Sequence, residues 1–199
     1  MSHSSVGGAG YTGEMNGLLD AAVEIAQFFD TNHWRYCVIG GLAVQRWGEP
    51  RTTLDADFTL LTDWGKEADF VDRILERFTA RIQDARDFAI SRRVLLVKSS
   101  KATPIDVSLG ALPFEVEMVS RAIAIDFAPD VTLPCCTAED LFVMKAFASR
   151  PRDWADVEGI VQRQGKLDTD YVMNHLRVLA ELKEEPEIVG RAKKLLGVD

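Results

Sequence analysis

The sequence predicts a mixed α/β (α+β) fold, in which a mixed β-sheet flanked by helices is followed by a helical C-terminal section. Short β-branched, apolar segments alternate with helical patterns up to about residue 136. Beyond that point only helical patterns with short breaks follow. The chain has 199 residues, 47% hydrophobic and 27% charged, which suits an ordinary globular protein that can bury a real core.

The first element is a helix over residues 16–32, where apolar residues recur at helical spacing behind Asn16, a cap residue. Gly48-Glu-Pro50 and a polar turn at 98–102 separate later elements. The strands expected are 36–39, 52–61, 90–97 and 104–109, with a weaker edge strand at 131–134. The helices expected between them are 42–47 and 67–78.

The C-terminal section begins with Thr137-Ala-Glu-Asp140, which has a hydroxyl and a carboxylate at the spacing of a helix start. Helices are expected at 141–149, 153–164, 168–182 and 186–196. Residues 1–13 are rich in Ser and Gly and lack Lys and Arg, so we expect a disordered tail there. The sequence thus divides into a tail (1–13), a core (14–136) and a helical section packed on the core (137–199).

Charge and composition exclude several classes of protein. A formal net charge of −8 disfavours a protein that coats nucleic acid through a general basic surface, although a local basic patch remains compatible. Apolar runs are too short to cross a bilayer and no secretory signal is visible, so we expect a cytoplasmic protein without a membrane partner. Cys37, Cys135 and Cys136 show no metal-ligand spacing, and we interpret them as reduced thiols.

Carboxylates on two expected strands carry the chemistry. Asp55 and Asp57 are two residues apart, so on a strand they would project from one face, with backbone anchors roughly 6 to 7 Å apart. Such a pair repels itself unless a cation compensates it, and hard oxygen ligands suit Mg²⁺, with Mn²⁺ as an alternative. Asp106 lies on the polar face of a later strand. If the strands are neighbours, three carboxylates can surround two metal ions about 4 Å apart.

An isolated Asp-x-Asp is more often a solvent-facing strand than a metal site. The upstream Gly40-Gly41 favours the metal site over the solvent-facing strand, because the two glycines follow an apolar strand and precede a helix. In that position the backbone can approach a ligand closely, and helical N–H groups can face a phosphate.

The strand, Gly40-Gly41, the helix and the run Arg51-x-Thr53-x-Asp55-x-Asp57 together resemble the nucleotidyltransferase superfamily that includes DNA polymerase beta. The resemblance is closest to its abortive-infection and toxin–antitoxin branch. It extends to Glu139–Ala148, which contains Lys145, and to Arg152–Ile160, so that it covers roughly residues 35 to 160. Gly41 stands where many members of the superfamily have Ser.

The resemblance implies a metal-dependent enzyme that moves NMP from an NTP to a hydroxyl acceptor. Asp55 and Asp57 would bind metal, whereas the assignment of Asp106 rests on strand spacing. All three would be catalytic, with Asp57 and Asp106 around one ion and Asp55 bridging two. One ion would lower the pKa of the attacking hydroxyl, and the other would neutralise the triphosphate.

The same resemblance implies a set of residues at the nucleotide: Gly40, Gly41, Arg51, Lys145 and Asp156. The glycines would hold triphosphate oxygens, and Lys145 would steady a phosphate. Asp156, or in second place Asp153, would orient the lysine or the attacking group. The alternative for Lys145 is a solvated helix residue, and for the two carboxylates a surface network at a helix start.

The expected partners are an NTP, an acceptor hydroxyl and a cognate antitoxin. An RNA end, a protein side chain and a small molecule such as an aminoglycoside all fit as acceptor, and the negative charge mildly favours the last two. The first rival is a catalytically silent nucleotide-binding regulatory module, which would not need all three carboxylates. The second rival is a phosphodiesterase or nuclease, but the sequence contains no His or Cys cluster that would favour one.

Overall fold

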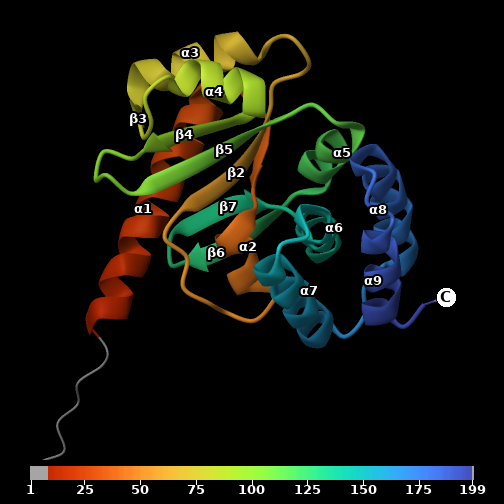
Figure 1. Cartoon of the computed structure of the whole chain (residues 1–199). Helices are drawn as coiled ribbons and strands as arrows, with labels where there is room; N and C mark the ends of the chain where they lie inside the picture. Colours follow the sequence, from red (N-terminus) through yellow and green to blue (C-terminus); the bar gives the residue numbers. More distant parts are fainter. Residues whose placement is uncertain (1–8, 199) are drawn as a thin grey trace, which may run out of the picture.

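A mixed β-sheet forms the centre of the molecule in the computed structural model, which describes residues 9–198 (Figure 1). In this part of the chain the sheet has seven strands in the order β3-β4-β5-β2-β1-β7-β6. The strands are β1 Tyr36–Val38, β2 Ala56–Leu61, β3 Thr79–Ala80, β4 Val94–Lys98, β5 Pro104–Gly110, β6 Ile123–Ala128 and β7 Val131–Cys135. The predicted mixed α/β class is thereby confirmed.

Strand pairing fixes the place of the acidic residues. β2 is parallel to β5 and antiparallel to β1, and the parallel register sets Asp57 opposite Asp106. Side chains alternate along a strand, so the neighbours of these residues face the other way. Phe58 shows this, because its ring lies 5.9 Å from that of Phe29 in the core.

Helices cover both sides of the sheet. They are α1 Ala9–Thr31, α2 Gly40–Trp47, α3 Glu67–Arg77, α4 Ala85–Arg92, α5 Pro113–Arg121, α6 Ala138–Ala148, α7 Pro151–Gln164, α8 Thr169–Lys183 and α9 Glu187–Leu196. α1 crosses one face and packs against β2, β5 and β7. α3 and α4 lie at the β3–β4 end, at the top of Figure 1, and α6 to α9 lie together at its right.

Two element starts differ from the prediction. α1 begins at Ala9 rather than at Asn16, so residues 9–13 of the expected tail are helical, and residues 1–8 lie outside the described part. β2 begins at Ala56 rather than at residue 52, and Asp55 therefore precedes the strand. The hydroxyl of Thr53 donates to the carboxylate of Asp55 at 3.0 Å, a local bond that competes with strand pairing.

Other segments had been assigned wrongly or not at all. The strand expected at 90–97 begins only at Val94, because α4 continues to Arg92 and Arg93 turns the chain with φ +55°. β7 is not an edge strand, since β6 pairs along its outer side. β3, α4, α5 and β6 had not been predicted.

The C-terminal helices follow the expected pattern. Thr137 caps α6, with its hydroxyl accepting from the Asp140 N–H at 3.3 Å while the Asp140 carboxylate accepts from the Thr137 N–H. α6 packs against α7 and α8, and α8 against α9. Trp154 of α7 is buried. Among residues 9–198, none of the helices combines the length and apolar character that a membrane-spanning helix requires.

Candidate active site

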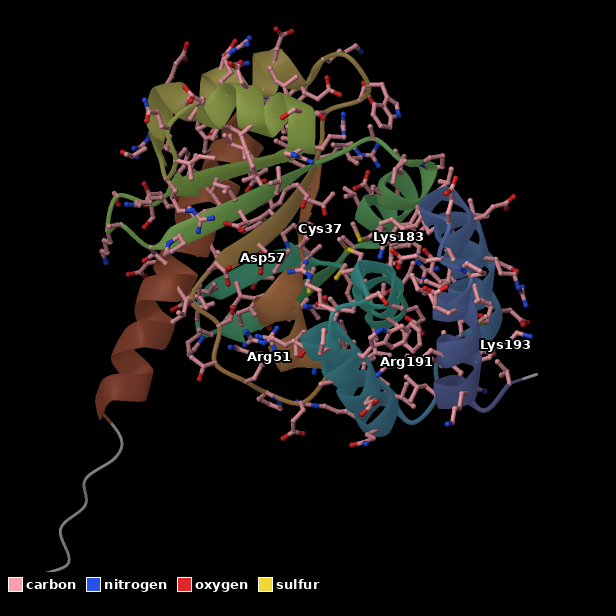
Figure 2. All side chains as sticks on the ribbon, in the orientation of Figure 1. Cys37, Arg51, Asp57, Lys183, Arg191 and Lys193 are labelled. Carbon is pink, nitrogen blue, oxygen red and sulfur yellow. The ribbon has the colours of Figure 1, made fainter. Side chains whose placement is uncertain are left out.

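A cavity of about 750 Å³ lies between the sheet and the helices α6 and α7. Asp57 and Arg51, labelled in Figure 2, lie on the side of the sheet toward these helices. The predicted site residues that line the cavity are Gly40, Gly41, Arg51, Asp55, Asp57, Asp106, Lys145 and Asp153. The structure therefore brings together residues that the sequence spreads over more than 100 positions.

Three carboxylates meet at the sheet wall of this cavity. Asp57 and Asp106 are register partners on the parallel strands β2 and β5. Asp55 joins them from the turn that leads into β2, although it had been expected on the strand itself. One carboxylate oxygen from each residue lies within 4.8 Å of the others. This is the grouping expected from the Asp-x-Asp spacing and the later strand.

The pKa of Asp57 is raised well above its ordinary value. Burial raises its pKa most, the Asp55 charge raises it further, and the result is a pKa of about 7 instead of 3.8. The N–H of Gly41 donates to Asp57 Oδ2 at 3.2 Å, which opposes the rise but does not cancel it. Among the described residues no cation forms an ion pair with Asp57, although the charge of Lys145 also acts to lower its pKa.

Asp106 has such a cation. Arg81 Nη2 lies 2.5 Å from Asp106 Oδ1, and both side chains are partly buried, at 21% and 27% exposed. Burial raises the pKa of Asp106, the positive charge of Arg81 lowers it, and the charge of Asp55 raises it again, so that the net direction is upward. Sequence reasoning missed Arg81, which no motif marks.

The glycine pair is packed tightly against the acidic residues. Gly40 has φ +60°, and a Cβ there would lie 2.0 Å from Asp57 Oδ2. A Cβ at Gly41 would lie 2.2 Å from Thr53 Oγ1. Both distances are far below a van der Waals contact, so side chains at these positions would displace Asp57 or Thr53. The two glycines therefore allow the carboxylate cluster to pack as it does, in addition to the contact with triphosphate oxygens that the resemblance implies.

The opposite wall is basic and comes from the C-terminal section. Lys145 Nζ on α6 lies 3.1 Å from Asp153 Oδ1 and 2.9 Å from Asp156 Oδ2, both on α7. Its side chain is only 14% exposed, which excludes the solvated-helix interpretation. Asp153 also accepts from the backbone N–H of Arg150 at 3.3 Å, so it both caps α7 and holds the lysine.

Asp156 joins two cations. It accepts two hydrogen bonds from Arg51, at 2.8 and 2.9 Å, in addition to its contact with Lys145. Burial alone would raise the pKa of Asp156, but the hydrogen bonds from Arg51 and Lys145 outweigh burial and lower it. Asp156 lies behind the cavity and contacts both cations. Arg150 and Arg152 line the cavity.

The carboxylate cluster suits a divalent cation. Its donors are three carboxylate oxygens, the hard ligands that Mg²⁺ and Mn²⁺ prefer. Burial first, and then the charges of Asp55 and Asp106, raise the pKa of Asp57, so a bound divalent ion would stabilise its ionised form. Asp55, Asp57 and Asp106 therefore fit the metal site that the sequence suggested.

Solved structures of two other proteins share this fold. An antigenic nucleotidyltransferase-like protein from Paracoccidioides brasiliensis has a TM-score of 0.52 and 14% identity, over 89% of this chain and 93% of its own. The antibiotic-resistance factor ANT(2'')-Ia has a TM-score of 0.51 and 13% identity, over 85% of this chain and 94% of its own. At these identities the likeness concerns the fold, which is that of the nucleotidyltransferases.

The sequence itself places the chain more narrowly. Residues 24–191 match the family model described as the nucleotidyl transferase AbiEii toxin of a type IV toxin–antitoxin system. This match spans most of the chain, so the chain belongs to the AbiEii nucleotidyltransferase toxin family and is a nucleotidyltransferase enzyme. The resemblance expected from the glycine pair and the Asp-x-Asp run is confirmed. No curated protein matches the chain.

Proposed function

We propose that this enzyme transfers a nucleoside monophosphate from an NTP to a hydroxyl acceptor, with Mg²⁺ or Mn²⁺ held by Asp55, Asp57 and Asp106. The observation that carries the proposal is the placing of three carboxylate oxygens within 4.8 Å of one another on the cavity wall opposite Lys145. When bound, the divalent ion would lower the pKa of the attacking hydroxyl and offset charge on the triphosphate.

The reaction proposed is a substitution at the α-phosphorus. The acceptor oxygen forms a bond to this phosphorus, the bond to the bridging oxygen breaks, pyrophosphate leaves and the hydroxyl proton passes to solvent. Lys145 is proposed to contact a triphosphate oxygen, because its ammonium is fixed at the cavity by two carboxylates. Arg51 reaches the same wall through Asp156 and would add positive charge there.

The charged side chains of the cavity wall also indicate which class of acceptor the enzyme uses. Arg150 and Arg152 line the cavity along with Arg51 and Lys145, and both are exposed. Cations beyond the two at the triphosphate favour an anionic acceptor such as an RNA end. A polycationic aminoglycoside would meet like charge on this wall. We therefore favour RNA, although the net charge of −8 had mildly favoured a protein or small-molecule acceptor.

An experiment with labelled nucleotides tests the proposal. The protein is incubated with each of the four NTPs, labelled at the α-phosphate, together with Mg²⁺. Total RNA, protein extract and an aminoglycoside are supplied as acceptors in separate reactions. We expect the α-label to appear in RNA, whereas a γ-label should appear only in pyrophosphate. Label in protein or aminoglycoside would contradict the acceptor class but not nucleotidyl transfer.

A matched control separates catalysis from binding. Asp57→Asn should retain the fold but lose transfer, whereas Asp126→Asn, at an exposed aspartate on β6, should transfer label as the wild type does. The rival is a catalytically silent nucleotide-binding regulatory module. Nucleotide binding without transfer to any acceptor, by wild type and variants alike, would favour that rival.

The family description also bears on partners and organisation. We propose that a cognate antitoxin opposes this enzyme, as the description of a toxin–antitoxin system suggests. The division into a core (14–136) and a helical section (137–199) and the cytoplasmic location remain proposals. Because Lys145 and Asp153 reach the cavity, the helical section would be part of the active site under this division.

A further inference from the structure

The ion pair between Arg81 and Asp106 has a particular geometry. Arg81 immediately follows β3, and its backbone N–H donates to the carbonyl of Leu96 at 3.0 Å. Leu96 is the register partner of Asp106 on the next strand. The two residues thus lie in one row across the sheet, two strands apart, a spacing of roughly 10 Å. Only a long side chain can span that distance, and the Arg81 guanidinium ends on Asp106 Oδ1.

The three carboxylates of the cluster differ in what compensates their charge. Asp55 accepts from the neutral hydroxyl of Thr53, and Asp57 accepts from the neutral N–H of Gly41. Among residues 9–198, the only ion pair that involves a carboxylate of the cluster is the one between Arg81 and Asp106. The Arg81 guanidinium, 2.5 Å from Asp106 Oδ1, offsets the negative charge that a divalent ion in the cluster would also use.

We propose that Arg81 is a positioning residue that occupies Asp106 in the metal-free enzyme and competes with the divalent ion for it. This inference rests on the proposed function, because it requires the metal site. Asp55 and Asp57 then bind the ion without displacing any cation. Arg81 contacts one of the two oxygens of Asp106, so Asp106 would offer its full charge to the ion only when Arg81 withdraws. Arg81 thereby sets the divalent-ion concentration at which the complete cluster forms.

Binding of Mn²⁺ to the full chain, without nucleotide, measures this competition directly. Free Mn²⁺ is followed by its electron paramagnetic resonance signal during a titration. Arg81→Gln should bind Mn²⁺ about tenfold more tightly than wild type, since the competing charge-assisted hydrogen bond is absent. Arg81→Lys, which keeps the charge but lacks the planar fork, should bind with intermediate affinity.

Arg86→Gln is the matched control. Arg86 forms a comparable pair with Asp72, at 2.6 Å, but this pair is exposed and its carboxylate is outside the cluster. We expect the Mn²⁺ isotherm of Arg86→Gln to equal that of the wild type. An Arg81→Gln isotherm equal to that of wild type would overturn the proposal, as would an equal gain in Arg86→Gln.

Two further variants separate this inference from the proposed function. In an Asp106→Asn background, Arg81→Gln should no longer change Mn²⁺ affinity, and a tenfold change there would show that Arg81 acts through another group. Asp57→Asn tests the metal site itself. If Asp57→Asn weakens Mn²⁺ binding while Arg81→Gln does not alter it, the proposed metal site is supported and the proposed role of Arg81 is wrong. If Asp57→Asn has no effect on Mn²⁺ binding, both the metal site and the role of Arg81 are wrong.

Discussion

Asp57→Asn removes one negative charge from the carboxylate cluster and keeps the size of the side chain. The amide oxygen can still accept from the Gly41 N–H, which lies 3.2 Å from Asp57 Oδ2. Raising a pKa from 3.8 to about 7 corresponds to roughly 4 kcal/mol at ~1.4 kcal/mol per pH unit. Asp57 borders an open cavity that screens part of this cost, so we expect the metal-free variant to gain about 1–3 kcal/mol at pH 8.

The sign of the pH dependence follows from the raised pKa. Between about pH 4 and pH 7 the folded wild type holds a proton on Asp57 that the unfolded chain has released, so its stability falls as the pH rises through this range. Above about pH 7 the loss is complete. The asparagine variant lacks this slope. The difference in melting temperature between variant and wild type, measured in EDTA, should therefore grow from pH 5 to pH 8, reaching about 2–12 °C.

Adding Mg²⁺ and ATP, or another NTP, should reverse the order of the two proteins. Wild type should gain stability by ligand linkage, whereas Asp57→Asn should gain far less because a metal ligand is missing. Transfer should drop by roughly 100-fold or more. Asp126→Asn serves as control in the same assay. Equal metal-dependent shifts in wild type and Asp57→Asn would refute the reasoning, because they would mean that Asp57 does not bind the ion.

Three further changes test the remaining parts of the site. Lys145→Met keeps the length of the side chain but removes its charge, and should weaken NTP binding by roughly 10-fold or more, since a charge-assisted hydrogen bond is lost; unchanged affinity in isothermal titration would exclude a phosphate contact. Gly41→Val should lower transfer and cost about 1–3 kcal/mol in urea unfolding, because its Cβ would lie 2.2 Å from Thr53 Oγ1 and must displace it; full activity would show that this packing is not needed. Asp156→Asn should cost about 3–5 kcal/mol at pH 7, as it leaves Arg51 and Lys145 without their shared carboxylate. Because the folded pKa of Asp156 is lowered, its contribution is complete above an unfolded pKa of about 3.9 and is lost as the pH falls through the folded value. The gap between wild type and Asp156→Asn in urea midpoint should therefore narrow from pH 5 to pH 3, and a constant gap would contradict this account.

The acidic half of the site could be predicted from the sequence because it depends on strand periodicity. Asp57 and Asp106 alternate with apolar residues, and this pattern was enough to place each on the polar face of its strand. That the two strands are neighbours is known only from the structure. Asp55 was assigned to the right cluster for a partly wrong reason, since it precedes β2. Its carboxylate is set by the bond from Thr53, a local interaction that alternation does not encode.

The helices and the strand that the sequence did not predict lack a regularly spaced row of buried apolar residues. α4 buries only Ala85 and Ala89, and α5 begins at a proline. β6 exposes both Ile123 and Ala124, so it shows no alternation. Arg81 was missed because its position depends on β3, two residues long, pairing with β4. Such a pairing is a tertiary event, and no window of the sequence around Arg81 contains it.

The bond between Arg51 and Asp156 joins positions 105 residues apart and has a consequence for the newly made chain. A ribosome-bound fragment that ends before α7 would carry Asp55, Asp57 and Asp106 but neither of the α7 carboxylates that hold Lys145. Its acidic and basic walls could not face each other in fixed positions. Because domains complete their folding as the last segments emerge, the enzyme would gain its activity only near the end of its own synthesis.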